Sequence, residues 1–144
     1  MQKIFGMGRI MAIDYGRKRC GVAVTDPLRI VANGLANVPA HELMAFIQNY
    51  VKTEQVDVIV VGEPKDMKNN ASESAKYIEP FVRQLEKTFP AIEIKRYDER
   101  FTSVIAHQTM LDAGLKKKQR QNKELVDTIS ATLILQSFMN FINR

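Results

Sequence analysis

The chain has 144 residues, of which 45% are hydrophobic and 26% charged, a composition typical of one soluble globular domain. No apolar run approaches the ~20 residues of a membrane-spanning helix, and the single cysteine excludes an internal disulfide, so we expect a cytoplasmic protein. The net charge of +5 favours an anionic partner without identifying it. We expect one domain over residues 1–144, with residues 1–8 as an N-terminal extension.

The first organised stretch predicts two strands joined by a tight turn. The strand Ile10–Ile13 ends on the carboxylate of Asp14, and a second apolar strand, Cys20–Thr25, follows the turn. The turn contains three cations and Gly16, which we expect to adopt a positive backbone angle. An acid at the mouth of a buried strand beside a cationic turn suits a metal ion and a phosphate chain. A hairpin with a solvated polar end explains the same pattern equally well.

The next elements alternate between strands and helices. We expect a third strand at Arg29–Val38 with a bulge or bend at Asn33-Gly34, then a helix opened by Pro39 and Ala40. Val56–Val61 is continuously apolar apart from Asp57, which indicates a parallel strand covered on both faces.

The second half continues the alternation. After a polar loop, the pattern predicts a helix from Ser72 to Thr88 that Pro80 kinks or interrupts, and then an alternating strand at Ile92–Tyr97. Thr102 or Ser103 can cap a further helix that Gly114 ends, and the last helix runs from Glu124 to Ile142.

This order of elements predicts an α/β fold with a mixed five-stranded sheet and helices on both faces. The first strand would lie centrally. Its carboxyl end, at Asp14, would sit beside the strand ends at Val61 and Tyr97, where open α/β sheets place their sites.

Three acids stand out by their position in these elements. Asp14 ends the central strand, Glu99 follows another strand, and Asp127 lies near the start of the last helix. Carboxylates are suitable ligands for Mg²⁺ or Mn²⁺, and two such ions ~4 Å apart can drive phosphodiester hydrolysis. A helix-start Asp can also simply complement the helix dipole. Asp98 competes with Glu99 for its role, and Glu63 is a further candidate at a strand end.

A basic segment, residues 116–123, immediately precedes the helix that carries Asp127. At the edge of an acidic metal site it could contact a nucleic-acid backbone, although a solvated charge run gives the same pattern. Its cations are Lys116, Lys117, Lys118, Arg120 and Lys123. The aromatic residues occupy mostly apolar helix positions, so no base-stacking platform is predicted, and neither His41 nor His107 has zinc-site spacing.

Together these motifs resemble the YqgF (RuvX) family of pre-16S ribosomal RNA nucleases, which is related to Holliday junction resolvases. The resemblance covers the chain from Arg9 onward. It rests on the motifs Ile13-Asp14-Tyr15-Gly16 with Lys18-Arg19 and Gly21-Val22-Ala23-Val24, Val60-Val61-Gly62 with Pro64, Asp98-Glu99-Arg100 with Thr102-Ser103, and Lys123 with Val126-Asp127 and Ala131.

The resemblance implies a ribonuclease H-like fold and a metal-binding catalytic triad of Asp14, Glu99 and Asp127, which favours Glu99 over Asp98. It also implies that Arg100 and the glycine turn support the site. The chain departs from the family at Glu63, where an apolar residue is usual, and in the glycine-free loop 65–71. The role of that loop is therefore open.

We therefore expect a Mg²⁺- or Mn²⁺-dependent nuclease that acts on precursor rRNA, alone or in ribosomal precursor particles. Arg17, Lys18, Arg19, Arg100 and the cations of residues 116–123 would bind the nucleic acid through its phosphates. A Holliday junction resolvase acting on branched DNA is the first alternative, and it normally requires a symmetric dimer, whereas the nuclease could be a monomer or a homodimer. A non-catalytic RNA-binding assembly factor and a relative of actin-like ATPases are further alternatives.

Overall fold

The computed structural model describes residues 8–63, 75–98 and 123–142, with only the backbone at 63, 75 and 123–127. The elements are β1 (Arg9–Asp14), β2 (Arg19–Thr25), β3 (Ala32–Pro39), a 3₁₀ turn η1 (Ala40–Glu42), α1 (Leu43–Thr53), β4 (Val56–Glu63), α2 (Ala75–Thr88), β5 (Glu93–Asp98) and α5 (Lys123–Ile142). Among the residues described, no helix is both long and apolar enough to cross a membrane.

The five strands form one mixed sheet in the order β3-β2-β1-β4-β5. β1 pairs antiparallel with β2 and parallel with β4, and β4 pairs parallel with β5. The sheet confirms the predicted fold class and the central place of the first strand.

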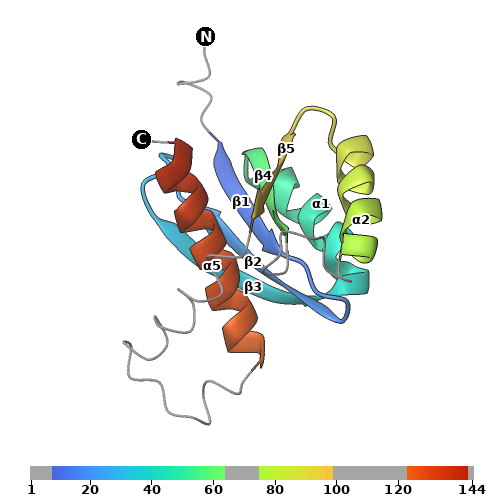
Figure 1. Ribbon diagram of the computed structural model, residues 1–144. Coiled ribbons are helices and arrows are strands. Elements are labelled where there is room, and N and C mark those ends of the chain that lie inside the picture. The colour runs from blue at the N-terminus through green and yellow to red at the C-terminus, as the bar shows by residue number, and fades with distance from the viewer. Residues whose placement is uncertain (1–7, 64–74, 99–122, 143–144) are drawn as a thin grey trace.

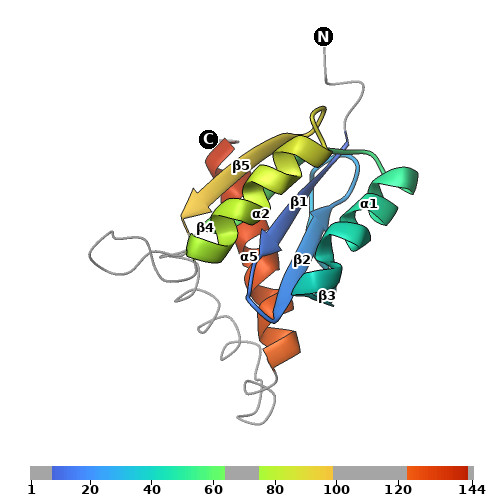
Figure 2. The same cartoon turned by 90° about the vertical axis from the view of Figure 1, so that its right-hand side faces the viewer.

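Helices cover both faces of this sheet, as Figures 1 and 2 show: α1 and α2 lie on one face, and α5 crosses the other. Strand alternation divides the core between the two faces. On β1, Met11 and Ile13 belong to the cluster under α1 and α2, whereas Ile10 and Ala12 belong to the cluster under α5.

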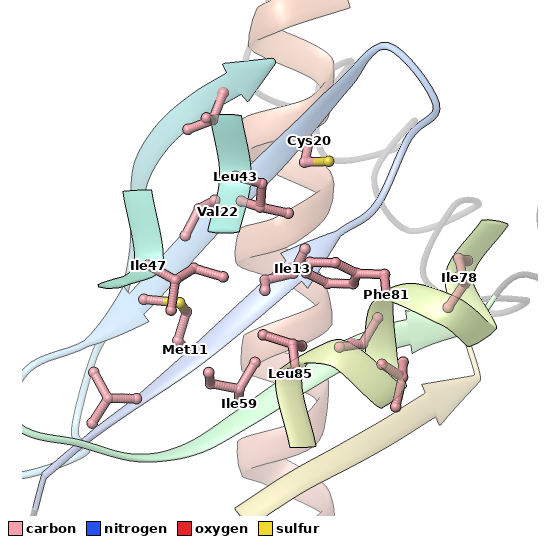
Figure 3. Close-up of a cluster of buried hydrophobic side chains, with 14 of the residues drawn as sticks. Met11, Ile13, Cys20, Val22, Leu43, Ile47, Ile59, Ile78, Phe81 and Leu85 are labelled. Atoms are coloured by element: carbon pink, nitrogen blue, oxygen red, sulfur yellow. The ribbon is translucent and has the colours of Figure 1, made fainter. Parts of the chain in front are cut away.

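The larger cluster packs two amphipathic helices against the sheet (Figure 3). Its fully buried members include Ile13, Ile59 and Leu85 from three different elements. Each fully buried branched side chain stabilises the fold by roughly 1.5–3 kcal/mol relative to exposure. Cys20 is buried in the same cluster.

Helix α5 lies close to the sheet because β3 presents a glycine to it. A Cβ atom on Gly34 would lie 2.6 Å from Thr128 Cγ2 and 3.3 Å from Thr132 Oγ1. Beyond this contact the helix packs through buried apolar residues onto β1, β2 and β4, namely Ala131, Ile134, Leu135, Phe138 and Met139.

The third strand begins later than predicted, at Ala32 rather than Arg29. The Asp26 carboxylate accepts backbone N–H groups from Leu28, Ile30 and Val31 at 2.7–3.1 Å, so these groups are used in a turn and not in the sheet. Arg29 within this turn has a φ of 59°. The predicted irregularity is present, because the β2–β3 register shifts between Val22 and Ala23, opposite Gly34 to Ala36.

Two helical predictions also need correction. The helix expected to open at Pro39 and Ala40 starts as the 3₁₀ turn and becomes α-helical only at Leu43. Of the two outcomes predicted at Pro80, a kink or an interruption, the interruption does not occur, because α2 continues through this residue. Pro80 lies on the exposed side, while Ile78 and Phe81 anchor the helix in the core. The predicted loop 65–71, the helix after Thr102 and the cations at 116–120 lie outside the described residues.

Candidate active site

The carboxyl ends of β1, β4 and β5 lie side by side, as the sequence predicts. Ile13 pairs with Val61, which places Asp14 level with Gly62. On the next strand Gly62 pairs with Tyr97, and Glu63 pairs with Asp98. Three strand ends that carry acidic residues therefore share one edge of the sheet.

Strand alternation separates the acids at this edge by face. Asp14 follows the alternation of Ile10 and Ala12, so its carboxylate belongs to the face covered by α5. Asp98 follows the alternation of Arg96, which forms an ion pair with Glu79 of α2 on the opposite face. Asp98 is thus on the wrong face to share a metal ion with Asp14.

Asp127 is carried by the first turns of α5. Its neighbour Thr128 lies against Gly34 of β3, so this part of the helix is held close to the sheet. In Figures 1 and 2, α5 begins at the end of the molecule toward which β1 runs. The backbone therefore brings the start of α5 to the same end and the same face as Asp14. The side chain of Asp127 lies outside the description, as does all of Glu99.

The turn after Asp14 is held against α2 by two aromatic contacts. The Tyr15 ring stacks on Phe81 with centroids 4.6 Å apart, and the Arg17 guanidinium lies 4.4 Å from the centroid of the Tyr77 ring. Burial raises the pKa of the Tyr15 hydroxyl above its usual value, with a smaller contribution from Cys20. These contacts fix the path of the chain directly beyond Asp14.

Gly16 is required in this turn for space and not for its backbone angle. Its φ lies outside the left-handed region, contrary to the prediction, but a Cβ atom would lie 2.4 Å from the carbonyl oxygen of Arg19. A backbone carbonyl cannot rotate away as a side chain does, so any larger residue must move the turn.

The predicted phosphate-binding cations are described only in part. Lys18 is exposed, and its backbone carbonyl accepts the N–H of Ala40, whereas Arg17 is engaged with Tyr77. Arg19 is partly buried. Of Lys123 only the backbone is described. The remaining cations lie outside the described residues, namely Arg100, Lys116, Lys117, Lys118 and Arg120.

A metal centre at this edge has Asp14 as its one fully described candidate ligand. Within the described part of the chain, no three His, Cys, Asp or Glu side chains lie close enough to hold a metal ion. The donor type nevertheless fits, because Asp14 presents a half-buried carboxylate at a strand end and hard divalent cations prefer carboxylate oxygens.

The structure also contains a pocket that the sequence did not predict. It lies between β5 and α5, has a volume of about 340 Å³, and is lined by Tyr97, Ser137, Asn140 and Phe141. Helical spacing assigns Phe141 to the same apolar pattern as the core residue Phe138, yet its exposed fraction is 52%. No sequence signal distinguishes these two rings, because the difference depends on where the sheet ends beneath the helix.

Known proteins match almost the whole chain. It is 63% identical over 133 residues to a "Putative pre-16S rRNA nuclease" of Bacteroides fragilis, covering 92% of this chain and 96% of the relative. A protein of the same description from Flavobacterium johnsoniae is 52% identical over 134 residues, covering 93% and 97%.

Among solved structures, Thermus thermophilus RuvC in complex with a Holliday junction substrate matches with a TM-score of 0.57 and 15% identity, covering 94% of this chain and 96% of that one. This likeness confirms the ribonuclease H-like fold. The RuvX family model, described as Holliday junction resolvase, matches residues 8–141. With its fold and nearly its whole length matched, the chain belongs to the RuvX family.

Proposed function

We propose that this protein is a metal-dependent nuclease that hydrolyses phosphodiester bonds during 5′-end processing of pre-16S rRNA. The observation that carries the proposal is the position of Asp14, at the carboxyl end of the central strand and on the face covered by α5. The family and the names of its relatives support the substrate. The buried thiol of Cys20, the only cysteine in the chain, suits the reducing cytoplasm.

In this proposal Asp14, Glu99 and Asp127 would hold Mg²⁺ or Mn²⁺, and Glu99 could instead orient the attacking water. Bound divalent ions would supply an activated water and stabilise the leaving oxygen. The sheet edge formed by β1, β4 and β5 would hold the Asp14 carboxylate in place before substrate arrives. Carboxylates gathered at one site repel one another, and a divalent cation removes that repulsion.

The chain's cations would bind the substrate backbone. Lys18, Arg19 and Arg100 lie next in sequence to the site, and residues 116–123 directly precede the helix of Asp127. Phosphate contacts of this kind position a nucleic acid without reading its sequence. Arg17 would contribute by holding the turn through Tyr77 as well as by its charge.

The proposal is tested with two labelled substrates in parallel, a 5′ segment of precursor 16S rRNA and a four-way DNA junction. Each is incubated with Mg²⁺, with Mn²⁺ and with EDTA. Metal-dependent cleavage of the RNA alone supports the proposal. Binding of the RNA without cleavage in any metal would contradict it and favour a non-catalytic assembly factor, while stabilisation by ATP would favour a nucleotide-binding relative.

A Holliday junction resolvase is the second candidate, favoured by the description of the family model that matches residues 8–141. Resolution requires two symmetric cuts and therefore two copies of the site. Paired cuts in the junction, made by a dimer in sedimentation experiments, would favour this function over rRNA processing. A protein that remains monomeric on junction DNA would argue against it.

A further inference from the structure

The pocket between β5 and α5 combines two aromatic rings with several neutral hydrogen-bonding groups. The Tyr97 hydroxyl and Ser137 Oγ share a hydrogen bond of 2.5 Å. Asn140 is exposed at the rim and offers both a donor and an acceptor. Among the residues that the structure describes around the pocket, none is charged. The pocket thus suits a planar neutral group better than a phosphate.

Tyr97 orients the aromatic rings around the pocket. Its ring makes edge contacts with Phe138, at 6.1 Å and 88°, and with Phe141, at 6.4 Å and 64°. Phe138 is buried, whereas Phe141 remains more than half exposed. The Phe141 ring is therefore supported on one side by Tyr97 and available to solvent on another.

The pocket lies on the same face of the sheet as the proposed catalytic edge, between Tyr97 and the last turns of α5. Tyr97 pairs with Gly62, which is level with Asp14, so the two residues are separated by two strand spacings, or ~10 Å. Tyr97 packs in the cluster under α5, and strand alternation from Ile10 and Ala12 places Asp14 on that same face of the sheet.

We propose that this pocket is a subsite for one unpaired nucleobase of the substrate strand, a few nucleotides from the bond that is cut. The base stacks on Phe141, and Asn140 and the hydroxyls of Tyr97 and Ser137 bond to its edge. Proteins commonly bind single strands by stacking bases on aromatic side chains in this way. The volume of about 340 Å³ is at the lower end of the ~300–1,000 Å³ range of small-ligand sites. The subsite rests on the proposed nuclease function.

The test measures binding of a short single-stranded oligoribonucleotide by fluorescence anisotropy in EDTA, which prevents metal-dependent cleavage. The intact strand is compared with strands made abasic at each position in turn. The variants are Phe141→Ala, Phe141→Leu, which keeps apolar bulk without a ring, and the control Ile30→Ala. Ile30 is 68% exposed in the turn between β2 and β3, away from the pocket. Thermal unfolding checks that all variants fold.

Both Phe141 variants should weaken binding of the intact strand about 5- to 150-fold, the effect expected for one stacked base. The loss should disappear for the strand that lacks the base at one particular position, and Ile30→Ala should bind as the wild type does. Equal losses for intact and abasic strands, or no loss, would refute the subsite. The subsite would also be refuted if sedimentation shows that the wild type is a dimer joined through Phe141 and Ile142, and that the only effect of Phe141→Ala is to make the protein monomeric.

Cleavage with Mg²⁺ is measured separately, so the two proposals can fail independently. RNA cleavage without base-dependent binding at Phe141 refutes the subsite and leaves the nuclease intact. Base-dependent binding by a protein that cuts no RNA refutes the nuclease function.

Discussion

Replacing Gly34 by alanine should destabilise the protein through a single steric contact. The added Cβ atom would lie 2.6 Å from Thr128 Cγ2, and a β-branched side chain has few χ1 rotamers to choose from in a helix. Overpacking of this kind costs about 1–3 kcal/mol, and the lower entropy of the unfolded chain offsets ~0.4–1 kcal/mol of it. We expect a net loss of roughly 1–2 kcal/mol, or a fall in Tm of roughly 2–8 °C.

Two second-site variants isolate that contact. Thr128→Ser removes the Cγ2 methyl and keeps the hydroxyl, whereas Thr128→Val keeps a methyl at the same branch. Urea unfolding of the single and double variants gives the coupling energy directly. Thr128→Ser should recover most of the stability lost in Gly34→Ala, because the remaining contact with Thr132 Oγ1 at 3.3 Å needs only a small shift. Thr128→Val should recover little.

The same variants connect packing with catalysis, because Thr128 is adjacent to Asp127. If α5 moves to accommodate the Cβ atom, Gly34→Ala should lower RNA cleavage even at temperatures where the protein is fully folded, and Thr128→Ser should restore it. Strictly additive effects of Gly34→Ala and Thr128→Ser on stability would refute the proposed contact between β3 and α5.

Three further predictions concern the turns and charges. Gly16→Ala should destabilise the protein by about 1–3 kcal/mol in urea unfolding, since its Cβ atom meets the Arg19 carbonyl at 2.4 Å; wild-type stability would contradict the close approach. Arg17→Ala should lower stability by ~0.5–1 kcal/mol through the lost contact with Tyr77, and the loss should vanish in a Tyr77→Ala background. Backbone N–H donors lower the pKa of Asp26, and the N–H of Val31 has the largest effect. The ionised Asp26 therefore stabilises the folded protein at neutral pH. This stabilisation is lost as the pH falls from ~4, the ordinary pKa of Asp, through the lowered pKa of the folded state. The Tm difference between wild type and Asp26→Asn should therefore narrow in acid, and a constant difference would contradict this.

The sheet could be predicted from the sequence because each of its main strands has a recognisable local pattern. The apolar runs of β1 and β4 end on polar residues, and their order allows few topologies. The start of β3 could not be predicted in this way. It depends on the Asp26 carboxylate capturing three N–H groups of the following turn, which is a matter of side-chain geometry and not of residue type.

The candidate site could also be predicted only in part. Asp14 could be identified as a candidate from its position at the end of a strand. Once the structure shows which face each helix covers, strand alternation assigns Asp14 and Asp98 to opposite faces of the sheet. The reason for Gly16 was not predictable, because a close carbonyl and a positive angle both select glycine. The pocket at Phe141 was hidden, since exposed and buried residues on one helix face follow the same spacing.

The central claim is that Asp14 is the metal-binding acid of the nuclease. The most direct measurement compares cleavage of the precursor 16S rRNA segment in Mg²⁺ by wild type, Asp14→Asn and the control Asp98→Asn at the end of β5. Circular dichroism first establishes that all three fold alike. The account predicts that Asp14→Asn abolishes cleavage and that Asp98→Asn, whose side chain belongs to the opposite face, retains it. Cleavage by Asp14→Asn at the wild-type rate, or equal loss in both variants, would contradict the account.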